Sequence, residues 1–147
     1  MTNLAVLKTT LSLEQFQKYL HCCIKDNKPA GNWFRHDHPI AIYLEENGFL
    51  VDSITNVDIS LKDGTQIGTP YKDPWGLIRN RFYPYLQSCL PNPHPGHIPL
   101  SVFDQWVSAF LQWKPKDYEA DELEVSPEEC LEFLHRFKSV AKVRSLQ

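Results

Sequence analysis

Apolar residues at helical spacing dominate residues 99–113, PLSVFDQWVSAFLQW, and we expect a central helix over about residues 101–113. Ser101 is typical of an N-cap with Asp104 three residues later, and Pro115 ends the helix. On a helical wheel the apolar residues cover an arc of roughly 200°, whereas a surface helix typically shows a stripe of about 100°. The arc comprises Val102, Phe103, Trp106, Val107, Ala109, Phe110, Leu111 and Trp113. Either several elements of the same chain or another molecule must therefore cover this helix.

Local capping signals predict two helices in the first third of the chain. The first runs from Ser12 to Ile24, where Ser12 and Gln15 form a capping box. The second is short, from Pro39 to about Asn47, because proline suits the first helical position and a glycine follows the last one. Its inward face is expected to comprise Ile40, Tyr43 and Leu44.

Two more helices are predicted in the second half of the chain. One is capped by Asp73 and reaches about Tyr83, where the following proline ends or kinks it. The last helix begins after Ser126, which forms a capping box with Glu129. The inner face of this last helix is expected to comprise Cys130, Phe133, Leu134, Phe137, Val140 and Ala141.

Alternating apolar and polar residues predict three strands, at residues 49–54, 57–61 and 65–69. In the middle strand three apolar residues alternate with Asp58 and Ser60, so one face of this strand is expected to be exposed to solvent. Residues 62–64, Lys-Asp-Gly, are a hairpin turn signal. The two-residue connection before the middle strand also implies antiparallel pairing.

These elements predict an α+β fold, since helices and strands do not alternate along the chain. We expect four to five helices around the central helix at about residues 101–113, with a small three-stranded antiparallel meander at about residues 49–69. The whole chain, residues 1–147, is expected to form one compact domain. Within it, residues 91–99 are a proline-rich connector and residues 114–126 an acidic linker.

The composition agrees with that of ordinary globular domains. A chain of 147 residues with 42% hydrophobic and 22% charged residues fits neither a disordered protein nor a membrane protein. The N-terminal sequence lacks the basic region of a secretory signal. The four cysteines form no CxxC pair, and we interpret them as reduced thiols of a cytoplasmic protein, with Cys23 buried on the apolar face of its helix.

The net charge of -3 hides an uneven distribution of charged residues. Residues 117–132 carry eight acidic and no basic side chains, and residues 133–147 carry four basic and no acidic ones. Acidic residues at the start of a helix and basic residues at its end both interact favourably with the helix dipole. Most of this asymmetry therefore has a structural explanation.

Histidines supply the first candidate chemistry, a metal site. His36, Asp37 and His38 are adjacent in sequence, and His94 and His97 form a second pair. Imidazole and carboxylate groups bind zinc and non-haem iron, so these five residues are the candidates for a metal-dependent enzyme. Prolines disturb both spacings, and Asp37 or His38 equally suits the cap of the helix that follows. We therefore expect no metal, no cofactor and no catalytic site.

The segment from Arg79 to Tyr85, RNRFYPY, is the second candidate, a site for single-stranded nucleic acid. Guanidinium groups neutralise phosphates and aromatic rings stack on bases. The net charge of -3 opposes this function, because nucleic-acid-binding domains usually carry a basic stripe. Arg79 and Arg81 would also point about 200° apart on a helix. Single-stranded nucleic-acid binding is therefore the alternative hypothesis.

No nucleophile elbow, P-loop or dinucleotide fingerprint occurs in the chain. We therefore interpret it as a small soluble non-catalytic protein that acts through protein-protein contacts, with a protein partner or a second copy rather than nucleic acid or a membrane. Val107 and Leu111, at the far edge of the wide apolar arc, are the hardest residues for the chain to cover. We expect them to form a partner-binding patch with Tyr83, Tyr85, Arg79 and Arg81, since exposed apolar and arginine-rich aromatic surfaces mark interfaces. The competing interpretation is that the central helix is simply core.

Overall fold

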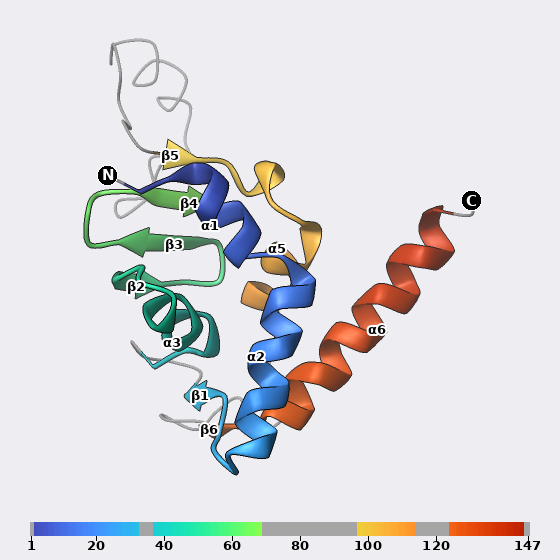
Figure 1. Cartoon of the computed structure of the whole chain (residues 1–147). Coiled ribbons are helices and arrows are strands. Elements are labelled where there is room, and N and C mark those ends of the chain that lie inside the picture. Colours follow the sequence, from blue (N-terminus) through green and yellow to red (C-terminus); the bar gives the residue numbers. More distant parts are fainter. Residues whose placement is uncertain (1, 33–36, 69–96, 114–123, 146–147) are drawn as a thin grey trace.

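The computed structural model describes residues 2–32, 37–68, 97–113 and 124–145, with side chains as far as Ser139 (Figure 1). The helices in these ranges are α1 (Leu4–Thr10), α2 (Leu13–Lys25), α3 (Pro39–Glu46), α5 (Gln105–Gln112) and α6 (Pro127–Ser145). The strands are β1 (Gly31–Asn32), β2 (Val51–Ile54), β3 (Asp58–Leu61), β4 (Gln66–Gly68), β5 (His97–Ile98) and β6 (Glu124–Val125). Helices together with sheets confirm the α+β class. The helix predicted near residues 73–83 lies outside the described residues.

The first predicted helix is present as α2, and its cap is the predicted one. The Ser12 side chain accepts a hydrogen bond from the amide nitrogen of Gln15 at 3.3 Å. Before it lies α1, a helix that the sequence pattern did not predict. Only Leu7 and Thr10 of α1 are buried, so its apolar pattern is too sparse to stand out from a loop.

The short helix α3 begins and ends as predicted. The Nδ1 atom of His38 accepts a hydrogen bond from the amide nitrogen of Ile40 at 3.1 Å, which makes this histidine the cap. After the helix, Gly48 adopts a positive φ of 89°, and the two residues after the C-cap donate backbone hydrogen bonds to carbonyls of the last turn. This arrangement is a Schellman motif. The predicted inward residues Ile40, Tyr43 and Leu44 are all buried.

The predicted capping box of α6 is present with both of its hydrogen bonds. The amide of Glu129 donates to the Ser126 hydroxyl at 3.1 Å, and the amide of Ser126 donates to the Glu129 carboxylate at 3.2 Å. Cys130 and Leu134 are buried as predicted. Phe133 and Phe137 are partly buried against the same core, and Val140 and Ala141 lie beyond the described side chains.

The central helix begins later than predicted, and Ser101 is not its cap. Ser101 lies in a single 3-10 turn, η2 (Leu100–Val102), and α5 starts only at Gln105. Phe103 separates the two with an extended backbone, φ -102° and ψ 167°. This break lets the Phe103 ring enter the core at 7% exposure, whereas Val102 remains 37% exposed. The tertiary burial of one aromatic ring thus outweighs the local capping signal.

The main sheet has four strands in the order β2-β3-β4-β5. The first three are antiparallel, as the sequence pattern suggests, and the turn at residues 62–64 joins β3 to β4. The prediction of a three-stranded antiparallel sheet is nevertheless wrong, because β5 adds a fourth strand parallel to β4. A two-residue strand next to prolines has no alternation to detect, so only its tertiary position reveals it.

Asp58 in β3 is buried at 2% exposure. The expectation that this residue lies on a solvent-exposed face of the strand is therefore wrong. Its carboxylate accepts hydrogen bonds from the Thr55 hydroxyl at 2.7 Å and from the Gln66 side-chain amide at 3.0 Å. Its cross-strand partner is Gly68, where an added Cβ would lie 2.6 Å from Cβ of Asp58. A buried carboxylate with such partners avoids most of the desolvation penalty.

A second, two-stranded sheet pairs β1 with β6 in antiparallel fashion, with Gly31 opposite Val125. β6 falls in the segment that was expected to be an acidic linker, residues 114–126, and the sequence pattern predicts no strand at β1. Gly31 lies so close to residues 37–39 that an added Cβ would be 2.3 Å from the carbonyl oxygen of Asp37. This small sheet joins the end of α2 to the start of α6.

The core is rich in aromatic rings, with Phe16 of α2 at its centre. The Phe16 ring stacks on Trp106 of α5 with centroids 5.0 Å apart, and meets Tyr43 and Phe110 edge-on at 5.2 Å. In Figure 1 the four-stranded sheet and α3 lie on one side of α2, and α6 lies on the other. The core therefore joins helices that are far apart in sequence.

Candidate functional site

Val107 and Leu111, the expected partner-binding edge of the central helix, are core residues. Val107 is 0% exposed and Leu111 is 3% exposed. The expectation of an exposed edge is therefore wrong. On the same helix, the Phe110 ring is surrounded by Phe16 of α2 and Phe133 of α6, so rings from both flanking helices cover an arc that one neighbour could not.

The structure does not describe the other four residues of the expected patch. Arg79, Arg81, Tyr83 and Tyr85 lie outside the described residues, as does the segment proposed to bind nucleic acid. The patch therefore loses its two apolar members to the core. Its aromatic and arginine members remain a prediction from sequence.

The histidine candidates do not form a described metal site. His36 and His94 lie outside the described residues, Asp37 is exposed and His38 is buried. His97 lies partly buried in β5. Nowhere in the described ranges do three His, Cys, Asp or Glu side chains come together as a group that could hold a metal ion.

His38 has a structural role that sequence reasoning foresaw as an alternative. Its Nδ1 atom is already used to cap α3, and its ring lies nearly perpendicular to the Phe110 ring, at 88°, with centroids 5.8 Å apart. Burial lowers the pKa of His38 to about 3, because the charged form would lose its hydration. The imidazole is therefore neutral at physiological pH.

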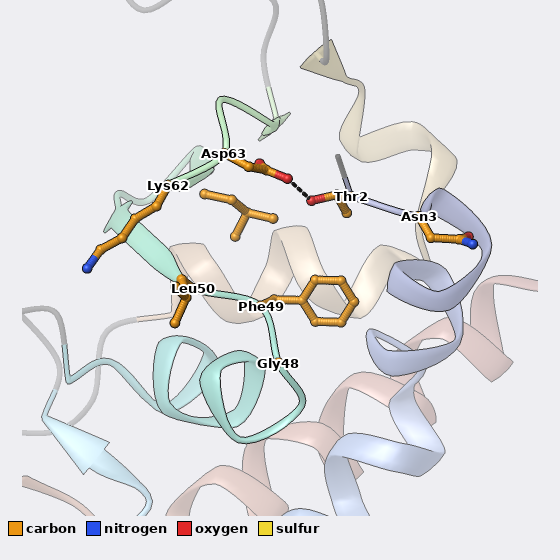
Figure 2. A pocket seen from close by; sticks show the side chains of 8 residues that line it. Thr2, Asn3, Gly48, Phe49, Leu50, Lys62 and Asp63 are labelled. Atoms are coloured by element: carbon orange, nitrogen blue, oxygen red, sulfur yellow. Dashed lines mark hydrogen bonds between the residues drawn. The ribbon is translucent and has the colours of Figure 1, made fainter.

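One pocket, of about 300 Å³, lies where the N-terminal residues meet the turn between β3 and β4. It is lined by Thr2, Asn3, Gly48, Phe49, Leu50, Leu61, Lys62 and Asp63. Figure 2 shows Thr2 and Asp63 joined across its rim and the Lys62 side chain pointing away from it. The hydroxyl of Thr2 and the amide of Thr65 both donate to Asp63 and lower the pKa of its carboxyl to about 2. This carboxylate ties the N-terminus to the hairpin and is not poised to accept a proton at neutral pH.

A smaller pocket of about 210 Å³ lies between the end of α2 and the start of α6, with Cys23 in its lining. Burial raises the pKa of both the Cys23 thiol and the Cys130 thiol. Only the thiolate is an effective nucleophile, so neither cysteine is activated for catalysis. The interpretation of Cys23 as a buried small hydrophobic residue is confirmed.

The third pocket, about 260 Å³, lies between the end of α5 and the first half of α6. We call it the aromatic pocket; it is lined by Trp113, Glu129, Glu132, Phe133 and Arg136. The Trp113 and Phe133 rings stack at 4.9 Å with an angle of 23° between their planes, and both are partly buried. Two large rings therefore reach the surface at one point.

Charged groups surround these rings. Arg136 forms an ion pair with Glu132, and both side chains are largely exposed, at 75% and 62%. Exposed pairs of this kind are worth little, about 0.3–0.5 kcal/mol, so a binding partner can replace them. The Glu129 carboxylate is held in place by the amide of Ser126. The aromatic pocket thus offers an apolar floor with charges of both signs at its rim.

Sequence reasoning named Trp113 and Phe133 only as members of apolar helix faces. One signal in the sequence could have pointed to this site. Trp113 lies directly after the last residue of α5, at the end of the apolar face of that helix. Arg136 lies one helical turn after Phe133. The meeting of the two helices at this point is, however, a tertiary feature.

No family model matches the chain, and searches of curated proteins and of solved structures return no match. Among the described residues, no helix combines the length and apolar character that crossing a membrane requires.

Proposed function

We propose that this protein is non-catalytic and acts through protein-protein contacts, with the aromatic pocket as a contact surface. The observation that carries this proposal is the stacked pair of Trp113 and Phe133, partly buried at the surface beside Arg136. Tryptophan and arginine dominate the residues whose truncation weakens protein interfaces, and aromatic rings are enriched at interface centres. The aromatic pocket replaces the Val107 and Leu111 edge, which is buried.

The other two described pockets give little support to a catalytic function. The Asp63 carboxyl, already hydrogen bonded, has a lowered pKa, and the thiols near the second pocket have raised pKa values. For a metal-dependent enzyme, the Nδ1 atom of His38 is committed to its helix cap. Binding of single-stranded nucleic acid by residues 79–85 remains an alternative from sequence alone.

The test is site-specific photo-crosslinking in cells. A photoreactive amino acid replaces Arg136 at the rim of the aromatic pocket, and in a matched control it replaces the exposed Asp52 in β2. β2 lies on the other side of α2 from α6 (Figure 1). We expect a discrete crosslinked protein from position 136 and none from position 52.

A second variant shows whether the pocket itself is used. Adding Phe133→Ala to the position-136 probe removes one ring of the stack and should reduce the crosslinked product strongly. Circular dichroism checks that this variant is still folded. Equal products from both probe positions, or no product from position 136, would show that the aromatic pocket is not a contact surface.

A further inference from the structure

The charges of α6 are separated along its length. Its acidic residues are Glu128, Glu129 and Glu132, all within the first six positions of this 19-residue helix. Its basic residues are Arg136, Lys138, Lys142 and Arg144, and the sequence has no acidic residue after Glu132. The helix is therefore acidic in its first half and basic in its second half.

The helix dipole explains only part of this separation. Its effect falls off within the first and last turns of a helix. Arg136 and Lys138 are the tenth and twelfth of the 19 residues, in the middle of α6, where the dipole favours neither sign. Their own contacts are an exposed ion pair of Arg136 with Glu132 and a hydrogen bond of Lys138 to Gln17 of α2, and exposed pairs of this kind are weak enough for a partner to replace.

The two halves of α6 also differ in how they meet the rest of the protein. The first half packs through the buried Cys130 and Leu134, and the aromatic pocket lies along it. Farther on, Lys138 donates a hydrogen bond to the Gln17 side chain of α2 at 3.2 Å. Beyond that point Figure 1 shows α6 extending away from the other labelled elements.

From this arrangement we infer that the partner at the aromatic pocket is a second copy of the chain, paired with the first through antiparallel α6 helices. Antiparallel pairing places the acidic half of each helix beside the basic half of the other. Parallel pairing would place like charges together. The pairing is two-fold symmetric, so both copies use the same surface, which is the commonest arrangement for homodimers.

The lining of the aromatic pocket fits this occupant. The basic half of the second copy's α6 would lie along the acidic half that carries the aromatic pocket, close to Glu129 and Glu132. Cations bind favourably both to carboxylates and over the faces of aromatic rings such as Trp113. This inference rests on the proposed function, because it names the partner of the same surface.

The experiment measures self-association of the full chain by sedimentation velocity over a range of protein concentrations. We expect a reversible dimer that weakens as salt is raised, since opposite charges hold the helices together. Two double variants each reverse charges in one half of α6. The first is Glu128→Lys with Glu132→Lys, and the second is Lys142→Glu with Arg144→Glu. Because like charges then face each other, each should weaken the dimer at least about tenfold.

Mixing these two double variants gives the decisive result. In the mixed pair, opposite charges face each other again at both ends, so an equimolar mixture should regain the dimer that each variant alone has lost. A loss of folding in either variant could not be restored by mixing. The matched control, Lys8→Glu with Lys62→Glu, changes the net charge by the same amount as Lys142→Glu with Arg144→Glu. Its two positions lie in α1 and in the turn after β3, so it should dimerise as the wild type does.

Three outcomes would overturn the inference: a wild-type chain that stays monomeric, a dimer insensitive to both charge reversals, or a mixture that fails to recover. Its failure differs from that of the proposed function. A monomeric chain that still crosslinks to a different protein from position 136 would refute the dimer and leave the aromatic pocket as a contact surface. A monomeric chain with no product from that position would refute both.

Discussion

The indole Nε1 of Trp106 donates a hydrogen bond to the carbonyl oxygen of Leu11 at 3.0 Å, across 95 residues of sequence. Both residues are buried. One residue earlier, the carbonyl of Thr10 accepts a hydrogen bond from the hydroxyl of Tyr43. The junction between α1 and α2 is thus held by side chains from α3 and α5. Because Thr10 is the last residue of α1 and Leu11 its C-cap, these bonds attach the end of α1 to the core.

Replacing the Trp106 indole by a smaller ring without a hydrogen-bond donor tests how much its hydrogen bond to Leu11 stabilises the fold. Trp106→Phe removes the hydrogen bond, leaves a buried carbonyl without this partner and opens a small cavity. We expect a loss of about 2–4 kcal/mol in the free energy of unfolding, measured by chemical denaturation with circular dichroism. The control Trp113→Phe keeps an aromatic ring at a partly buried position and should lose less. A loss below about 1 kcal/mol for Trp106→Phe would mean that this hydrogen bond contributes little.

Val107 provides a test of the corrected position of the central helix. Val107→Glu places a carboxylate at a fully buried position, and we expect it to lower the thermal midpoint steeply or prevent folding. Gln105→Glu, at an exposed position at the start of the same helix, should leave the midpoint nearly unchanged. If Val107→Glu instead kept the midpoint and abolished partner binding, the original expectation of an exposed edge would return.

His38 predicts a pH dependence of stability. Its pKa is about 3 in the folded protein, whereas an unfolded histidine titrates near 6.5. Between these values the unfolded chain binds a proton that the folded protein does not. His38 therefore lowers the free energy of unfolding by about 1.4 kcal/mol for each unit that pH falls from about 6 towards the folded pKa of about 3.

The matched variant for this prediction is His38→Asn, which can still cap α3 but does not titrate. Denaturation curves at pH 7, 5.5 and 4 give the free energy of unfolding of both proteins. We expect the wild type to lose stability more steeply than the variant as pH falls. Parallel curves for the two proteins would show that the His38 imidazole accepts a proton in the folded state as readily as in the unfolded one.

Gly68 packs directly against the backbone of Val57 and Asp58, where a side chain has no room. An added Cβ would lie 2.4 Å from the carbonyl oxygen of Val57 and 2.6 Å from Cβ of Asp58, at a φ of 142°. We expect Gly68→Ala to reduce the free energy of unfolding by about 3 kcal/mol or more. Gly64→Ala is the control, because φ is also positive there, at 93°, but no atom lies within 4 Å; it should lose only about 1 kcal/mol. Equal losses would attribute the effect to backbone conformation alone.

The sequence by itself determined those elements whose signals are local. The hydroxyl cap of Ser12, the capping box of Ser126 and Glu129, and the glycine after α3 each act within a few residues. The hairpin turn between β3 and β4 is equally local. Such features can be predicted because both partners of each interaction lie in one short stretch of chain.

Tertiary structure alone decided the features whose partners are distant in sequence. The parallel pairing of β4 with β5 and the pairing of β1 with β6 depend on contacts that no local pattern contains. The helical wheel correctly showed that α5 has an unusually wide apolar arc. Whether Val107 and Leu111 lie in the core or on the surface depended on how many neighbours reach them, and the rings of α2 and α6 packed around α5 show that its own chain supplies the cover. The aromatic pocket exists for the same reason, because Trp113 and Phe133 meet only where two helices from separate parts of the chain pack together.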